Sequence, residues 1–193
     1  MQVIGVVGRS GCGKDELADY LSDRYGMEVF SIGRLVAQLA EKRGLHPNRK
    51  NLHQISAQVI EEKGADFFAR TVIEAVDASG CEKAVIAGVR TPEDVGALRD
   101  HYPQFLLVNV TIGDQRARFA RISERAAERD PRGFAMFLEQ DMEEEELFHI
   151  GDTVNLADVT IRNVGTLAQL DAEIDLRIGS RLGLLPASHQ GLP

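Results

Sequence analysis

The sequence lacks the residue spacings that mark metal-binding and redox sites. It has two cysteines, Cys12 and Cys81, which lie too far apart to form a Cys-x2-Cys pair. Its five histidines are scattered and include no His-x3-His pair, so no zinc site is expected. Few cysteines without a pattern predict a protein of a reducing compartment.

Long apolar runs and an excess of positive charge are also missing. The first apolar run, Val3–Val7, contains a glycine and is far shorter than the roughly 20 residues of a spanning helix. No secretory signal is recognisable, so we expect a cytoplasmic protein without membrane contact. The chain has 22 Lys and Arg against 30 Asp and Glu, a formal charge of −8. This balance argues against an extended nucleic-acid surface.

What is present indicates one ordinary globular domain. The chain has 193 residues, of which 44% are hydrophobic and 27% charged, as in folded soluble proteins. We find no internal repeat and no linker. A single domain is therefore expected over residues 1–180, followed by a tail, residues 181–193, that shows no periodicity.

Short apolar segments alternate with segments of helical periodicity. The expected strands are Val3–Val7, Glu28–Ser31, Ala84–Val89, Phe105–Ile112 and Ala157–Asn163. Helices are expected to begin near Gly13, after caps at Asn51 and Thr91, and at Asp114. Further helices are expected over Leu35–Lys42, Asp66–Ala78, Gly133–Glu146 and Thr166–Ile178. Apolar strands alternating with helices predict a parallel sheet covered on both faces. The fold class is thus a three-layer α/β/α arrangement with a five-stranded parallel sheet.

The segment after the first strand matches the pattern G-x4-G-K of a phosphate-binding loop. It consists of Gly8, Arg9, Ser10, Gly11, Cys12, Gly13 and Lys14. Glycines let successive backbone N–H groups point at phosphate oxygens, and the following helix adds its positive N-terminus. Cys12 is expected to contribute only its backbone. Since strand, loop and helix occur in the required order, we predict a phosphate-binding loop and not a glycine-rich turn.

Asp15 stands where such loops carry Ser or Thr, whose hydroxyl contacts the metal of the bound nucleotide. Mg²⁺ readily accepts carboxylate oxygen, so Asp15 is a candidate metal ligand, directly or through water. The alternative is that Asp15 is only a favourable acid at a helix N-terminus. Ala87, at the end of the third strand, occupies a place that commonly holds a metal-binding acid.

Arginines recur between residues 116 and 129. They are Arg116, Arg118, Arg121, Arg125 and Arg129, and the last four fall close to one helical face. Either polyphosphate or the neighbouring acids Glu124, Glu128 and Asp130 supply the counter-charge. We favour phosphate, with Arg121 and Arg125 the best candidates, because arginines stabilise the transition state of phosphoryl transfer.

Two further charged features differ in what they predict. Arg90 leaves the carboxyl end of a strand, where open α/β sheets bind ligands, and this favours a phosphate contact over a surface position. The acidic run Asp141–Glu146 is expected to be a solvated helix face. No general base is recognisable.

These features together resemble the nucleoside-monophosphate-kinase group of phosphate-loop proteins. The chain is similar to an adenylate-kinase-related family of archaeal and bacterial proteins, with dephospho-CoA kinases as distant relatives. The landmarks are GRSGCGKD, SIGRLV, GADFFAR, VIAGVRTPEDV, RFARISER and ADVTIRNVGTLAQL. The resemblance implies ATP and Mg²⁺ as cofactors and a helical lid over about residues 116–150.

The resemblance also implies roles for particular residues. The segment Gly8–Glu16 would hold the ATP phosphates and the metal. Arg121 and Arg125 would be lid arginines, with Lys14 the third catalytic residue. Asn163 to Gly165 would lie beside the nucleotide base.

The acceptor side departs from the family pattern. That pattern has Gly-Asp after the second strand and an arginine three residues beyond the Asp, whereas this chain has Gly33-Arg34 and then Ala37. Arg34 and Arg70 are expected to supply the missing positive charge beside Arg90, the arginine matched to the acceptor phosphate.

The function that follows is ATP-dependent phosphoryl transfer to a small acceptor, most readily a nucleotide, by a monomer or homodimer. Two alternatives remain open. One is a dephospho-CoA kinase or other metabolite kinase, whose hydroxyl acceptor would want a nearby carboxylate. The other is an ATP-binding regulator without turnover, for which Ala37 and Ala87 argue.

Overall fold

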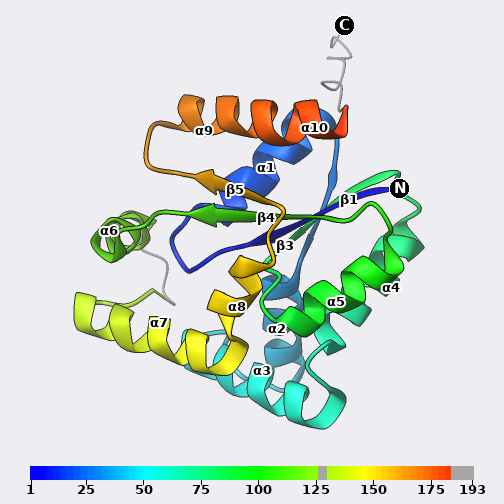
Figure 1. The fold of residues 1–193 in the computed structure, drawn as a ribbon. Helices are drawn as coiled ribbons and strands as arrows, with labels where there is room; N and C mark the ends of the chain where they lie inside the picture. Colours follow the sequence, from blue (N-terminus) through cyan, green and yellow to red (C-terminus); the bar gives the residue numbers. More distant parts are fainter. Residues whose placement is uncertain (126–129, 184–193) are drawn as a thin grey trace, which may run out of the picture.

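The five expected strands form one parallel sheet in the order β2-β3-β1-β4-β5 (Figure 1). The computed structural model describes residues 1–125 and 130–183. The strands are β1 (Gln2–Val7), β2 (Glu28–Ser31), β3 (Lys83–Ala87), β4 (Leu106–Thr111) and β5 (Val159–Arg162). Because β1 is central and every neighbour is parallel, the segments that follow the strands all emerge at one edge of the sheet.

Helices cover both faces of the sheet, which confirms the three-layer α/β/α arrangement. They are α1 (Lys14–Tyr25), α2 (Ile32–Lys42), α3 (Arg49–Lys63), α4 (Phe67–Ser79), α5 (Pro92–His101), α6 (Gln115–Arg125), α7 (Phe134–Phe148), α8 (Ile150–Asn155), α9 (Leu167–Ile174) and α10 (Ser180–Leu182). No helix in the described ranges is long and apolar enough to cross a membrane.

Two apolar cores follow from the alternation of side chains along the central strand. Val3 and Val7 point to the core formed with α2, α3, α4 and α5, whereas Ile4 and Val6 point to the core formed with α1 and α9. All four side chains are buried. Burial on both faces explains why β1 reads as a nearly continuous apolar run.

Of two helix caps that the sequence predicts, Thr91 is confirmed and Asn51 is displaced. Thr91 caps α5 with Pro92 in the first turn, and Asp94 completes a capping box. The expected cap Asn51 is wrong, because Asn48 caps α3 and accepts a hydrogen bond from the backbone N–H of Asn51.

Other boundaries differ for local reasons. The strand β3 ends at Ala87 and not at Val89, because Gly88 turns the chain with a φ of 86°. The short helix α8 was not expected. The last helix keeps α-geometry only to Ile174 and continues as a π-helical turn over Asp175–Gly179. Helical structure then reaches Leu182, past the expected start of the tail at residue 181; residues 184–193 lie outside the described part of the chain.

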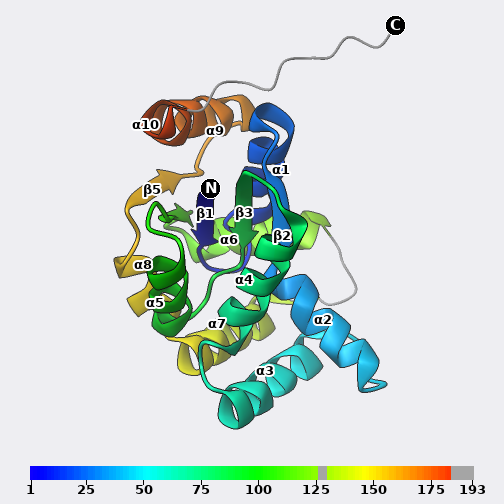
Figure 2. The ribbon, with the colours of Figure 1, turned by 90° about the vertical axis from the view of Figure 1, so that its right-hand side faces the viewer.

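The expected lid contains α6 and α7, which lie where the strands end (Figure 1). Figure 2 shows α2 and α3 extending away from the sheet, with α7 beside α3. The phosphate-loop segment, the lid and the α2–α3 pair therefore surround the carboxyl ends of the strands, which is where open α/β sheets bind ligands.

Candidate active site

A cavity of about 560 Å³ opens at the carboxyl ends of the strands. This volume suits a small-molecule ligand. The lining of the cavity comes from several segments of the chain. The phosphate-loop segment supplies Gly8, Ser10, Gly11, Gly13 and Lys14, and the first turn of α1 supplies Asp15 and Glu16. The segments that run from β2 into α2 and onward from the end of β3 supply Ser31, Gly33, Arg34, Ala37, Ala87, Gly88, Val89 and Arg90. The more distant helices supply Arg49 of α3, Arg121 and Arg125 of α6, and Glu144 of α7.

The phosphate-loop segment folds into a tight curve around Lys14. The Nζ atom of Lys14 donates hydrogen bonds to the carbonyl oxygens of Gly8, at 2.7 Å, and Arg9, at 3.0 Å. Gly13 ends the loop with a φ of 96°, where a Cβ would come within 2.2 Å of Asn163 Nδ2. Only glycine fits at this point, because both the backbone conformation and the close approach exclude a side chain.

Asn163, a predicted nucleotide contact, instead supports the phosphate-loop segment through a hydrogen bond. Asn163 is buried, and its Nδ2 donates to the carbonyl oxygen of Cys12 at 3.0 Å. Asn163 and Gly165 do not line the cavity, and neither do Arg9 and Cys12. Burial raises the pKa of the Cys12 thiol, which fits the expectation that this residue contributes only its backbone.

The two predicted lid arginines both line the cavity. Arg121 donates to the carbonyl oxygen of Asn163 at 3.0 Å. Arg125 pairs with Asp130 through two hydrogen bonds of 3.0 and 2.6 Å. The bonds to Asp130 raise the pKa of Arg125, and the negative charges of Asp15 and Glu16 raise it further.

Arg118 does not line the cavity with Arg121 and Arg125, contrary to the expectation that these arginines share one face. It is buried and donates two hydrogen bonds to the carboxylate of Asp141, at 2.7 and 2.6 Å, and a third to the carbonyl oxygen of Ser10. Arg118 thus joins α6, α7 and the loop and does not line the cavity. The position of Arg129 lies outside the described residues.

The acidic run on α7 is only in part the solvated face that was expected, with Glu143 and Glu146 exposed. Asp141 and Glu144 are buried, while Met142 between them is exposed. Asp141 pairs with Arg118, Glu145 forms an ion pair with Arg9, and Glu144 forms one with Arg49. The reason is that α7 packs against arginines supplied by three other segments, which the sequence of α7 alone does not reveal.

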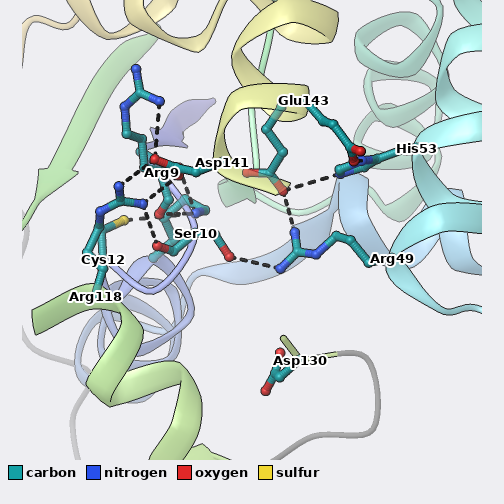
Figure 3. Close-up of polar contacts among 12 residues, drawn as sticks. Arg9, Ser10, Cys12, Arg49, His53, Arg118, Asp130, Asp141 and Glu143 are labelled. Carbon is teal, nitrogen blue, oxygen red and sulfur yellow. Dashed lines mark hydrogen bonds and ion pairs between the residues drawn. The ribbon is translucent and has the colours of Figure 1, made fainter. Parts of the chain in front are cut away.

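Arg49 and His53 of α3 complete this arrangement and were not anticipated from the sequence. Arg49 donates to Ser10 Oγ at 3.0 Å, and its Nε atom is buried without a partner among the described residues. His53 Nδ1 lies 3.1 Å from Glu143 Oε2. Figure 3 shows Arg118 and Arg9 beside Asp141, with Arg49 and His53 on the side of Glu143.

The three predicted acceptor arginines separate into two groups. Arg34 and Arg90 line the cavity, and Arg90 also lies over the ring of Phe148 at 4.8 Å. Arg70 does not reach this site: it pairs with Asp66 on the same helix turn and borders a separate hollow between α4 and α5. The prediction that Arg70 supplies acceptor charge is therefore not supported.

The comparisons with known proteins agree with this arrangement. Residues 4–149 match the AAA domain family. A UPF0200 protein of Pyrococcus horikoshii is 32% identical over 187 residues, which covers 95% of this chain and 100% of the relative. The chain belongs to the UPF0200 family. The expected membership of a family of phosphate-loop proteins is thereby confirmed.

Solved structures of small-molecule kinases resemble this UPF0200 protein in fold. Shikimate kinase from Bacteroides thetaiotaomicron has a TM-score of 0.62 at 13% identity, and the match covers 95% of this chain and 99% of that one. A gluconokinase from Sinorhizobium meliloti has a TM-score of 0.54 at 14% identity, covering 94% and 95%. At such identities the likeness establishes the fold of a phosphate-loop kinase.

The residues of the UPF0200 site fit a magnesium–nucleotide complex better than a metal bound by protein alone. Asp15 and Glu16 line the cavity near Arg125, whereas Ala87 offers no ligand at the end of β3. No group of three potential ligands gathers anywhere in residues 1–125 and 130–183. Mg²⁺ in kinase sites keeps several waters and uses one or two carboxylates plus phosphate oxygens. Asp15 and Glu16 meet that requirement.

Asp15→Ala is expected to raise the Mg²⁺ concentration needed for half-maximal rate about tenfold or more, since a carboxylate near the metal is lost. Arg125→Ala is the matched control, because it removes a cavity charge that does not bind a cation. It should lower the rate with little change in the Mg²⁺ midpoint. Magnesium titrations of ATP turnover measure both. An unchanged midpoint in the Asp15 variant contradicts the ligand role.

Glu144→Gln is expected to destabilise the protein at neutral pH and much less in acid. Burial alone would raise the pKa of Glu144, but His53 and the charges of Arg49, Arg90 and Lys14 outweigh it and lower the pKa from 4.5 to about 2. The ionised carboxylate therefore stabilises the fold above pH 4.5, by an amount on the order of 3 kcal/mol at about 1.4 kcal/mol per pKa unit. This contribution disappears as the pH falls toward 2.

Urea unfolding of both proteins at a series of pH values measures this difference. The gap in the free energy of unfolding should be widest at neutral pH and should close on acidification. A gap that stays constant with pH contradicts the ionised pairing of Glu144 with its neighbours.

Proposed function

We propose that this protein transfers the γ-phosphoryl group of ATP to a small acceptor in a magnesium-dependent reaction. One observation carries the proposal: a single cavity is lined by Lys14 of the phosphate-loop segment, by the lid arginines Arg121 and Arg125, and by Arg34 of α2 and Arg90 after β3. Phosphoryl transfer depends on positioning and on neutralising charge, and such convergent cations provide both.

Each group of residues has a distinct part in the reaction. The loop N–H groups and Lys14 bind the β- and γ-phosphates, where bound Mg²⁺ neutralises charge on the phosphate oxygens. Asp15 and Glu16 hold the water shell of the metal. Arg121 and Arg125 neutralise the charge of the transferring group, and both lie close enough to the loop to line the same cavity.

The acceptor is a small molecule that carries an anionic group, with a nucleoside monophosphate, a deoxynucleotide or a related nucleotide as the first candidate. Arg34 and Arg90 favour an anion on the side of α2. Ala37 also lines that side, in place of a further arginine, so an acceptor other than AMP is favoured. The reaction of a hydroxyl-phosphorylating metabolite kinase is the second candidate, and the cavity-lining carboxylate of Glu144 favours it.

An ATP-consumption screen tests the proposal. Purified protein with ATP and Mg²⁺ is offered nucleoside monophosphates, deoxynucleotides, dephospho-CoA, phosphomevalonate, shikimate and gluconate, and ADP formation is followed. Formation of ADP that depends on one of these acceptors supports a kinase. ATP binding without ADP formation for any of them supports a regulator that binds nucleotide without turnover.

A further inference from the structure

Glu144 brings a carboxylate from α7 into the cavity, where the charges of Arg90 and Lys14 act on it. The side chain lines the cavity, although only 8% of the residue is exposed. Its Oε1 atom pairs with Arg49 and lies 3.6 Å from His53 Nε2. Its Oε2 atom accepts no hydrogen bond from any residue that the structure describes. One oxygen is thus held by the protein, and the other is left for a ligand.

The neighbours of Glu144 fix its orientation. Arg49 joins the carboxylate to Ser10 Oγ of the phosphate-loop segment, 3.0 Å from the guanidinium. His53 is in turn held by Glu143, one residue before Glu144 on α7. The carboxylate is therefore anchored to α3 and to the loop that would bind the γ-phosphate, which places it near the site of transfer.

A fixed carboxylate at this position is unfavourable for one kind of acceptor atom and favourable for another. A phosphate oxygen that attacks the γ-phosphate brings negative charge next to the charge of Glu144, and like charges repel strongly in a partly buried site. A hydroxyl group instead donates a hydrogen bond to a carboxylate, and bonds to charged acceptors are about twice as strong as neutral ones.

We propose that the accepting atom is the oxygen of a hydroxyl group and that Glu144 receives the hydrogen bond of this hydroxyl. The inference rests on the kinase function proposed above and narrows the acceptor to a small anionic alcohol. Its anionic group meets Arg34 or Arg90, and its hydroxyl lies between Glu144 and the γ-phosphate. A nucleotide with a free sugar hydroxyl and a hydroxy acid both meet this description.

Transfer to the hydroxyl forms one phosphorus–oxygen bond and breaks another. The hydroxyl oxygen bonds to the γ-phosphorus while the bond from that phosphorus to the β–γ bridging oxygen breaks, and ADP leaves with the electron pair of that bond. The hydroxyl proton is released to water. Because the pKa of Glu144 is about 2, the carboxylate orients the hydroxyl and does not retain the proton.

The linkage in the product tests the inference on the unaltered protein. Every acceptor of the screen above carries a free hydroxyl, and those with a terminal phosphate also offer a phosphate oxygen. Phosphorus NMR of the product shows which of the two oxygens was phosphorylated. A phosphate monoester, without coupling to a second phosphorus, is expected. A new phosphoanhydride overturns the hydroxyl inference while leaving the kinase function intact. Absence of transfer to every acceptor overturns the kinase function and this inference together.

Glu144→Gln then tests the residue itself. It is expected to lower kcat about 100-fold or more, since the hydroxyl loses the acceptor that orients it. The Kd for ATP should stay within about twofold, since Lys14 and the loop N–H groups are kept. Glu146→Gln, the same change at an exposed position on α7, is the matched control and should retain wild-type kcat. Because Glu144→Gln is also expected to be less stable at neutral pH, kcat is measured under conditions where circular dichroism shows the variant folded. A purely structural role would then lower ATP affinity together with kcat. If the Glu144→Gln variant binds ATP normally and transfers at the wild-type rate, the role of Glu144 is overturned.

Discussion

Replacing Lys14 by alanine is expected to lower ATP turnover by about 1,000-fold or more, because the developing charge on the phosphates loses its nearest fixed cation. The ammonium group lies at the centre of the loop, bonded to the carbonyl oxygens of Gly8 and Arg9, so it is already in place for phosphate. The measurement is kcat and KM for ATP with the acceptor found in the screen.

Lys42→Ala is the control for this variant, because Lys42 is exposed near the end of α2 and does not line the cavity. It should behave as the wild type. Circular dichroism of both variants checks that the fold is retained. If Lys14→Ala keeps more than about a tenth of the wild-type kcat, the loop is not the site of phosphoryl transfer.

Arg118→Met is expected to lower the free energy of unfolding by about 3 kcal/mol or more. Arg118 and Asp141 are both buried, with 4% and 6% of their side chains exposed, and removal of one partner leaves a buried charge. The guanidinium of Arg9 lies 3.7 Å from Asp141 and partly compensates the charge of that carboxylate. The loss is therefore expected nearer the lower end of the roughly 3–5 kcal/mol that is typical of breaking a buried ion pair. Urea unfolding at neutral pH measures the effect.

Two controls separate the buried charge from the loss of an arginine. Arg177→Met breaks an exposed pair with Glu173 and should cost less than about 1 kcal/mol. The double variant Arg118→Met with Asp141→Leu removes both buried charges and should recover much of the loss. Equal destabilisation by Arg118→Met and Arg177→Met contradicts the account of α7 as a helix held to the loop by buried ion pairs.

The sequence predicts the sheet well because each strand carries its own signal. Apolar side chains on both faces of β1 and β4 mark buried parallel strands, and the helix after Thr91 is marked by its cap and by Pro92. The errors lie at boundaries that depend on one residue. Gly88 ends β3 early through its positive φ, and Asn48 caps α3 in place of Asn51.

The site is predictable only where it is contiguous in sequence. The loop from Gly8 to Lys14 is one segment, so its pattern predicts both its shape and a phosphate ligand. The pairs of Glu144 with Arg49 and of Asp141 with Arg118 join residues that are 95 and 23 positions apart. Sequence periodicity shows that α7 has an acidic face, but only the packing of α3 and α6 against that face makes it part of the site.

The most direct test of the central claim follows the γ-phosphate itself. Protein is mixed with γ-labelled ATP, Mg²⁺ and the acceptor panel under single-turnover conditions, and the label is traced to ATP, inorganic phosphate or an acceptor. The account predicts that the label moves to one acceptor, and that this transfer is lost in Lys14→Ala. Label that stays in bound ATP, or appears only as inorganic phosphate with every acceptor, contradicts it.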